Sequence, residues 1–146
     1  VDSTIDIDLD LLVQKSSDNP VYYVQYAHAR TAAVERNAID AGVHLADGVD
    51  TGLLNTPADT ELLAVLGQYP ATVRTAAEFY EPHRMSRYLE NLAAAYHSWY
   101  GLSRVAPKGD EPVTDLHRTR LLLNNATRQV LANGLGLLGV TAPERM

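Results

Sequence analysis

The fold is decided by the stretch Asn19-Pro20-Val21-Tyr22-Tyr23-Val24-Gln25-Tyr26-Ala27-His28-Ala29-Arg30, which continues through Val34-Glu35-Arg36-Asn37 to Ala41. Asp18 or Asn19 can accept hydrogen bonds from the first free backbone N–H groups, and Pro20 suits the first position of a helix. Gly42 follows the stretch, where a residue in the left-handed conformation commonly ends a helix. The stretch therefore predicts a long helix from about Pro20 to Ala41.

Two faces of this helix differ in character. Successive residues advance by about 100°, so Tyr23, Tyr26 and Arg30 fall within about 60° of one another, whereas Arg36 points away from them. A neighbouring strip is expected to face a core, and it consists of Val24, Ala27, Thr31, Val34 and Ala38. Two aromatic rings beside a guanidinium form a surface on which unpaired bases can stack. Helical spacing alone favours another interpretation, in which the tyrosines are half-buried packing residues with hydrated hydroxyl groups.

The later segments also show the periodicity of helices. The expected helix starts, marked by proline or by a capping threonine, are Thr56-Pro57, Pro70, Pro82 and Thr114. Apolar residues recur at helical spacing from Pro82 to Tyr100 and from Thr114 to Leu138, so these two helices and the first are expected to be the longest. Near the amino terminus, Ile5, Ile7 and Leu9 alternate with aspartates, which is typical of a short extended segment, and Leu11, Leu12 and Val13 then continue towards Lys15 as an expected short helix. The prediction is one all-α helical bundle of five to six helices over residues 1–146, with any extended structure confined to the first dozen residues.

Composition limits the classes of function. The chain has no cysteine, which excludes disulfides and thiolate metal sites and fits a reducing cytoplasm. No apolar run reaches the length of a membrane span, and no signal peptide is visible, so neither a membrane nor a secretory location is expected. The net charge of −6 argues against a general DNA- or RNA-binding protein. Charge is unevenly distributed, because residues 1–61 have a balance of −8 and residues 62–146 a balance of +2.

The sequence contains partial matches to catalytic and metal-binding motifs, but the residues around each match do not fit such a site. Gly134-Leu135-Gly136-Leu137-Leu138-Gly139 matches the dinucleotide pattern G-x-G-x-x-G, but it ends a predicted helix, so close helix packing is the expected reason for its glycines. The aspartates near the amino terminus lack the glycine and glutamate of a calcium loop. The five histidines show no metal-ligand spacing, and His28 on the key helix is expected to be a structural polar group. No catalytic residue and no metal site are predicted.

Both ends of the chain resemble one family. The first is the opening stretch from Asn19 to Asn37. The second comprises Asp115-Leu116-His117-Arg118, Leu121-Leu122-Leu123, the run from Ala126 to Leu131, the glycine-rich segment and Pro143-Glu144-Arg145-Met146. These segments resemble the carboxy-terminal anticodon-binding domain, of the DALR type, of bacterial arginyl-tRNA synthetases. The resemblance implies a class I synthetase domain that holds the anticodon stem and loop of the tRNA for arginine, with residues 1–17 as a connecting segment from a missing catalytic domain.

The resemblance also implies where the chemistry of the parent enzyme lies. Such a parent joins arginine to its tRNA with ATP and magnesium, and its signatures of the His-x-Gly-His and Lys-Met-Ser-Lys-Ser types do not occur in these residues. ATP and arginine would therefore bind the catalytic domain of the same parent chain. The present chain alone is expected to contain no cofactor and to be catalytically inactive.

The resemblance implies five anticodon-binding residues. Tyr23, Tyr26 and Tyr100 would stack on bases, Arg30 would contact a phosphate or a base edge, and Met146 would make an apolar or carboxylate contact. Among the other basic residues, Arg84, Arg87 and Arg118 are candidates for phosphate contacts, although solvated helix faces explain them equally well. The alternative function is a helical protein-interaction module that uses the same tyrosine face, and a third, a stand-alone enzyme, is disfavoured by the missing motifs.

Overall fold

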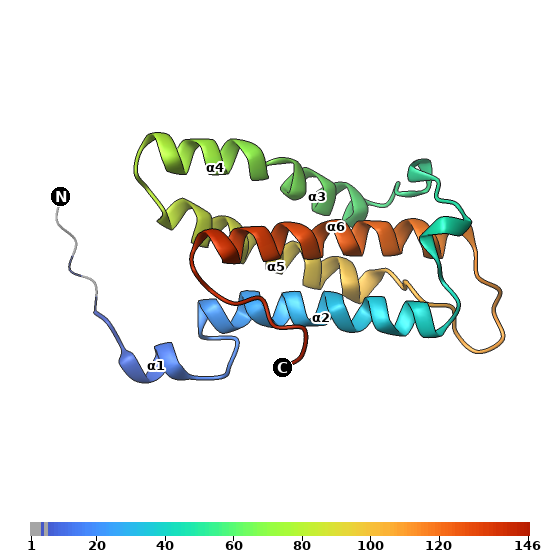
Figure 1. The fold of residues 1–146 in the computed structure, drawn as a ribbon, viewed down its shortest axis with the longest axis horizontal. Coiled ribbons are helices and arrows are strands. Elements are labelled where there is room, and N and C mark those ends of the chain that lie inside the picture. The colour runs from blue at the N-terminus through green and yellow to red at the C-terminus, as the bar shows by residue number, and fades with distance from the viewer. Residues whose placement is uncertain (1–3, 5) are drawn as a thin grey trace.

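The chain forms a helical bundle (Figure 1). The computed structural model describes residues 4 and 6–146, and within them it contains six α-helices, two short 3-10 helices and no β-strand. The α-helices are α1 (Leu9–Val13), α2 (Pro20–Asp40), α3 (Pro57–Gly67), α4 (Tyr69–Glu78), α5 (His83–Leu102) and α6 (Asp115–Leu137). The 3-10 helices, η1 (Leu45–Asp47) and η2 (Thr51–Leu53), lie in the loop between α2 and α3. The all-α prediction is confirmed, and α2, α5 and α6 are the longest helices.

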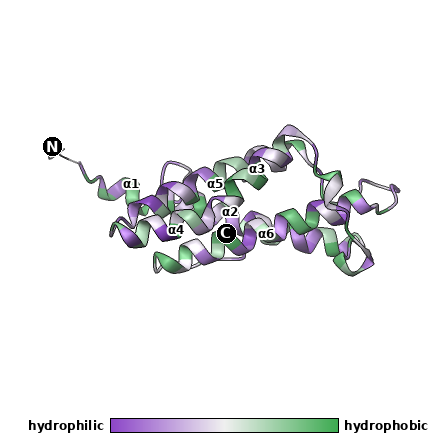
Figure 2. Ribbon diagram, turned by 90° about the horizontal axis from the view of Figure 1, so that it is seen from above, coloured by the Kyte–Doolittle hydropathy of each residue, from purple (hydrophilic) through white to green (hydrophobic). Residues whose placement is uncertain are grey.

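The amino-terminal segment differs from the prediction in part, because the expected short helix is present as α1 but begins earlier, at Leu9. Asp6, Ile7 and Asp8 have no regular structure, whereas Leu9 already belongs to α1, and Ile5 lies outside the described residues. The carboxylate of Asp8 accepts hydrogen bonds from the N–H groups of Asp10 and Leu11, so a local cap starts a helix where the alternation predicted a strand. α1 buries none of its side chains, and in both views it lies at the end of the molecule that carries the amino terminus (Figures 1 and 2).

Local capping explains where the longer helices begin. Asn19, and not Asp18, caps α2, because its Oδ1 accepts from the N–H groups of Val21 and Tyr22 at 3.1 and 3.4 Å. Thr56 and Asp59 form a reciprocal capping box at the start of α3. α5 continues to Leu102, two residues beyond the expected end, because Gly101 stays helical and does not adopt the left-handed conformation that ends a helix.

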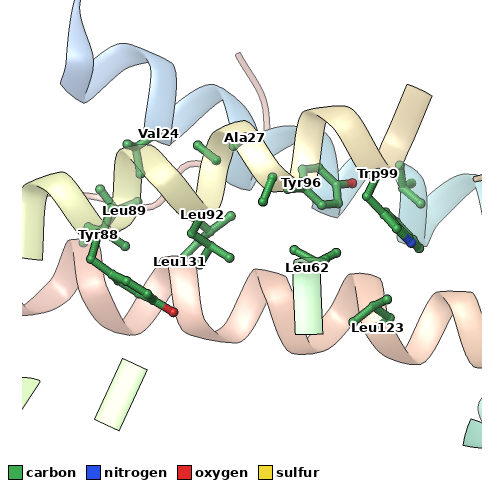
Figure 3. Packing of buried hydrophobic residues seen from close by; sticks show 14 of the residues in the cluster. Val24, Ala27, Leu62, Tyr88, Leu89, Leu92, Tyr96, Trp99, Leu123 and Leu131 are labelled. Atoms are coloured by element: carbon green, nitrogen blue, oxygen red, sulfur yellow. The ribbon is translucent and has the colours of Figure 1, made fainter. Parts of the chain in front are cut away.

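α5 is the centre of the bundle and packs against α2, α3, α4 and α6. Its Leu89, Leu92, Tyr96 and Trp99 are at most 1% exposed and lie in one continuous core with residues of the other helices (Figure 3). The apolar strip predicted on α2 is confirmed, since its five residues are buried against this core: Val24, Ala27, Thr31, Val34 and Ala38. Other parts of α2 are exposed, such as Tyr26 and Asn37, although His28 and Ala29 are buried as well.

Two hydrogen-bonded groups of polar side chains lie inside the core, whereas the buried His97 Nε2 and Arg120 Nε have no hydrogen-bond partner among the described residues. Tyr96 donates its hydroxyl hydrogen to Asn124 Oδ1 at 2.7 Å, and Asn124 donates to the carbonyl oxygen of Thr31 at 3.0 Å, which links α5, α6 and α2. Trp99 Nε1 donates to Asp59 Oδ1 at 2.8 Å and links α5 to α3. These bonds fix the rotation of the helices, because a buried polar group without a partner is costly.

The glycine-rich segment at the end of α6 has mixed roles. A Cβ atom on Gly134 would lie 2.5 Å from Leu89 Cδ2, so this glycine permits the close approach of α6 to α5 that the sequence predicted. Gly136 has open space around it, and Gly139 adopts a φ of +71° where the chain turns after α6. Close packing therefore explains one of the three glycines, and turn geometry explains another.

The segment after α6 turns back and crosses α2 (Figure 1). Residues 140–146, called here the carboxy-terminal tail, place Val140 and Ala142 against the core, while Glu144, Arg145 and Met146 are exposed. The described part of the chain has no helix with the length and apolar character needed to cross a membrane. It also has no cluster of three or more side chains of the histidine, cysteine or carboxylate kind arranged to hold a metal ion.

Candidate nucleic-acid interface

The side chain of Arg30 lies between two aromatic rings. Its guanidinium carbon is 4.8 Å from the centre of the Tyr26 ring and 4.7 Å from the centre of the Tyr100 ring. Tyr26 comes from α2, one turn before Arg30, and Tyr100 comes from the last turn of α5. The contact between α2 and α5 thus brings together a cation and two rings at cation–π distance.

Hydrogen bonds hold the guanidinium of Arg30 in place. Its Nη2 donates to Tyr26 Oη at 2.8 Å, and its Nη1 donates to His97 Nδ1 at 3.0 Å. Because a guanidinium only donates, Nδ1 of His97 accepts and the ring hydrogen is on Nε2. Within the described residues no carboxylate lies within ion-pair distance of Arg30. The cation is therefore oriented but not neutralised, which leaves it available to an anion or to the polar edge of a base.

His97 lies beneath the two tyrosines of α2. The centre of its ring is 5.2 Å from that of Tyr23 and 5.8 Å from that of Tyr26. Burial, and secondarily the charge of Arg30, lower the pKa of His97 from its ordinary value of 6.5 to about 4. His97 is therefore neutral near pH 7 and supports Arg30 without adding a second positive charge.

These residues open onto a surface concavity of about 570 Å³, called here the tyrosine–arginine cleft. It is lined by Tyr26, Ala29, Arg30, Ala33, Val34, Arg36, Asn37, Tyr100, Glu144, Arg145 and Met146. Tyr26 is 37% exposed, Tyr100 42% and Met146 52%, so both tyrosine side chains and Met146 are partly accessible to solvent. The volume lies within the range of about 300–1,000 Å³ typical of pockets for small ligands, which is sufficient for a nucleobase.

The structure brings together four of the five residues that the resemblance named: Tyr26, Arg30, Tyr100 and Met146 all line the cleft. Tyr23 does not line it. Its ring is half-buried and packs against the core and His97, which matches the packing interpretation of the tyrosines. Tyr22 takes the place beside Tyr26 on the outer face of α2, where the two rings stack with centres 6.5 Å apart.

Sequence reasoning missed four polar residues of the cleft, which are Arg36, Asn37, Glu144 and Arg145. Asn37 could have been found, because it lies seven residues after Arg30 on the same helical stripe. The expectation that Arg36 points away from the site is wrong, because its guanidinium donates to the carbonyl oxygen of Glu144 at 3.3 and 3.4 Å and borders the cleft. The helical spacing was correct, but the carboxy-terminal tail extends the site around α2 to Arg36.

The three other candidate phosphate contacts lie elsewhere, since Arg84, Arg87 and Arg118 do not line the cleft. Arg84 forms an ion pair with Glu81, and Arg118 forms one with Asp115 and also donates to the carbonyl oxygen of Gly48 at 2.6 Å. Local contacts therefore account for two of these arginines.

Comparison with known families matches residues 24–146 to the DALR anticodon binding domain. The chain belongs to this family. The DALR domain described here is 61% identical over 146 residues to an arginine–tRNA ligase of Kineococcus radiotolerans, and 57% identical over 145 residues to that of Clavibacter sepedonicus. The two alignments include 100% and 99% of the present chain, but only 26% of each relative.

A solved structure shares the fold of this DALR domain. The arginyl-tRNA synthetase of Thermus thermophilus superposes with a TM-score of 0.75 at 33% sequence identity, over 97% of the present chain and 24% of the synthetase. Because the chain spans about a quarter of the length of its curated relatives, it is similar to one region of these ligases and not to the whole. The resemblance to a DALR-type anticodon-binding domain, inferred from the sequence, is therefore confirmed.

Proposed function

We propose that this chain binds the anticodon stem and loop of the tRNA for arginine, as the carboxy-terminal domain of an ATP-dependent arginine–tRNA ligase. The observation that supports this most directly is the un-neutralised guanidinium of Arg30 held between the rings of Tyr26 and Tyr100. An RNA loop presents unstacked bases and phosphates, and the cleft offers ring faces for the bases and a cation for a phosphate or base edge.

In this proposal each residue of the cleft has a separate role. Tyr26 and Tyr100 stack on bases, Arg30 contacts a phosphate or base edge, and Met146 contributes an apolar or carboxylate contact. Tyr23 supports Tyr26 and His97 from below, since its ring faces His97 and not the cleft. Asn37 adds an exposed amide that can read the polar edge of a base.

The chemistry of the parent enzyme lies outside this chain in the same proposal. Arginine, ATP and magnesium bind the catalytic domain, residues 1–17 connect that domain to the bundle, and the full-length enzyme acts in the cytoplasm. Residues 4 and 6–17 are consistent with a connecting role, because α1 buries no side chain in the bundle.

The experiment compares aminoacylation by the full-length protein with that of cleft variants. Tyr26→Ala should weaken binding of the arginine tRNA by about tenfold, because stacking of a base on an aromatic ring contributes about 1–3 kcal/mol. Tyr80→Ala is the matched control, since Tyr80 is 91% exposed and does not line the cleft. The readout is kcat/KM for the tRNA, and an unchanged value in Tyr26→Ala would remove this cleft from the anticodon site.

Salt dependence separates RNA binding from the alternative, a protein-interaction surface. Arg30→Ala should weaken tRNA binding and reduce the slope of log K against log salt by about 0.7–0.9 if the contact is to a phosphate. Arg74→Ala on α4 is the control, because Arg74 is exposed and does not line the cleft. A tyrosine surface that docked a protein would give a far weaker dependence on salt.

A further inference from the structure

The carboxy-terminal tail reaches the tyrosine–arginine cleft only because the chain reverses after α6. Gly139 makes the turn, and residues 140–146 then cross α2 towards the carboxyl end of α5 (Figure 1). Met146 ends this path as an exposed side chain beside Tyr26, Arg30 and Tyr100. Its position therefore depends on the contacts that hold the tail.

Outside the cleft, two side chains of α2 hold the tail, in addition to Arg36, which donates to the carbonyl oxygen of Glu144 at the cleft itself. His28 is 3% exposed, and its Nδ1 lies 2.8 Å from the carbonyl oxygen of Pro143. Because a carbonyl oxygen only accepts, Nδ1 of His28 carries the hydrogen and donates it. Gln25, one turn earlier, donates from Nε2 to the carbonyl oxygen and the hydroxyl oxygen of Thr141 at 3.0 and 3.3 Å. The tail thus follows a row of donors along α2.

A third side chain outside the cleft, Arg128 of α6, also binds the tail. Its guanidinium forms ion pairs with Glu35 on α2 and Glu144 in the tail. A polar concavity of about 440 Å³ lies under the tail, lined in part by His28, Glu35, Arg128 and Glu144. Near Glu144 the tail is therefore held by polar contacts, whereas Ala142 supplies only a small apolar one.

We propose that Gln25, His28 and Arg128 are positioning residues for RNA binding, which form a clasp that holds residues 141–144 on α2 and so places Met146 at the tyrosine–arginine cleft. None of the three lines the cleft, so they act on RNA only through the tail. The functional part of this inference rests on the proposed function. The structural part, that the clasp places Met146, is independent of RNA.

The placement of Met146 is tested first, with the 146-residue chain labelled at its methionine methyl groups. The chain has two methionines, and Met85 is 4% exposed in the core, so it serves as an internal reference for folding. In NMR spectra, His28→Ala and Arg128→Ala should move the Met146 methyl signal to the sharp, random-coil position and leave the Met85 signal in place. A Met146 signal that stays unchanged beside an intact Met85 signal would refute the clasp.

The variant His28→Asn separates the hydrogen bond that His28 donates to Pro143 from the packing of its ring. The side-chain amide nitrogen of asparagine can occupy the place of Nδ1 and donate to Pro143, but asparagine lacks the volume of the ring. The Met146 signal should therefore stay near its native position in His28→Asn. Where His28→Ala unfolds the chain and the Met85 signal is lost, Gln25→Ala tests the clasp instead, because Gln25 is only partly buried.

The effect on RNA is tested in the full-length protein with an anticodon stem-loop of the arginine tRNA. His28→Ala and Arg128→Ala should weaken binding about three- to tenfold, the range expected for losing one hydrogen bond that positions a contact. Gln68→Ala is the matched control, because Gln68 is exposed and lines neither the cleft nor the concavity under the tail. If the wild type fails to bind the stem-loop, the proposed function fails while the NMR result still stands. If the wild type binds and released-tail variants bind equally well, the positioning inference fails.

Discussion

At the scale of the residue, the cleft depends on how one arginine is held. A long arginine side chain on a helix surface ordinarily loses rotamer entropy when it is ordered, and an exposed ion pair offsets little of that cost. Arg30 is ordered by neutral groups, the rings of Tyr26 and Tyr100 and the imidazole of His97. Its positive charge therefore remains available to bind a ligand.

The lowered pKa of His97 leads to a prediction about pH and stability. The unfolded chain binds a proton on His97 near pH 6.5, whereas the folded chain does so only near pH 4. The free energy of unfolding should therefore fall as the pH falls from about 6.5 to about 4, because the proton favours the unfolded state there. Urea unfolding at several pH values measures it, and His97→Gln should show a shallower fall than the wild type.

Two comparisons make that result specific. The pKa of His117 is also lowered, mainly by burial, so acid destabilises the wild type through a second histidine. The effect of His97 is therefore measured as the difference in pH dependence between the wild type and His97→Gln. The same substitution at the exposed His44 is the control. Equal pH dependence in wild type and His97→Gln would show that Arg30 does not hold a neutral imidazole.

At the scale of the element, the approach of α6 to α5 is set by one glycine. Leu89 of α5 fills the space that a side chain at Gly134 would need, and both residues are buried. The same two helices, with α2, surround the pair formed by Tyr96 and Asn124. A shift of α6 would therefore disturb both packing and a buried hydrogen bond.

Two alanine substitutions in α6 should have opposite effects. Gly134→Ala should destabilise the domain by about 1–3 kcal/mol, because the new Cβ would lie 2.5 Å from Leu89 Cδ2. Gly136→Ala should stabilise it by about 0.5–1 kcal/mol, because that position has open space and alanine is the better helix former. Thermal or urea denaturation measures both. Loss of stability in Gly136→Ala, or none in Gly134→Ala, would contradict the packing described here.

At the scale of the whole molecule, α2 to α6 share one core with α5 at its centre. Trp99, the only tryptophan, is fully buried at the end of α5 that is nearest the cleft, and it bonds to Asp59 of α3. A chain of this size with a single core is expected to unfold in one cooperative step.

Cooperative unfolding can be tested with two probes. Trp99 fluorescence reports the core, and far-UV circular dichroism reports all the helices. Their urea transitions should coincide in midpoint and slope, because no group of helices has a core of its own. Two separate midpoints would show that part of the bundle, such as α3 with α4, unfolds independently.

The helical bundle could be predicted from the amino-acid sequence, because helix starts depend on local groups. Proline or threonine marks the beginning of α2, α3, α4 and α6, and the apolar strip of α2 follows from helical spacing alone. The same reasoning failed at Leu9, where a capping aspartate outweighed an alternating pattern, and at Gly101, which stays inside α5. A local pattern predicts a helix well, but its last residue depends on what the helix packs against.

The residues of the cleft come together only through tertiary packing. Tyr100 and Met146 were expected from the resemblance and not from spacing, since both are far from Arg30 in the sequence. They meet Arg30 because α2 packs against α5 and because the tail returns over α2. The same packing turned Tyr23 towards His97 and brought Arg36 to the cleft. The physical reason is that periodicity places a side chain on one face of one helix, whereas its neighbours depend on contacts between segments that are distant in the sequence.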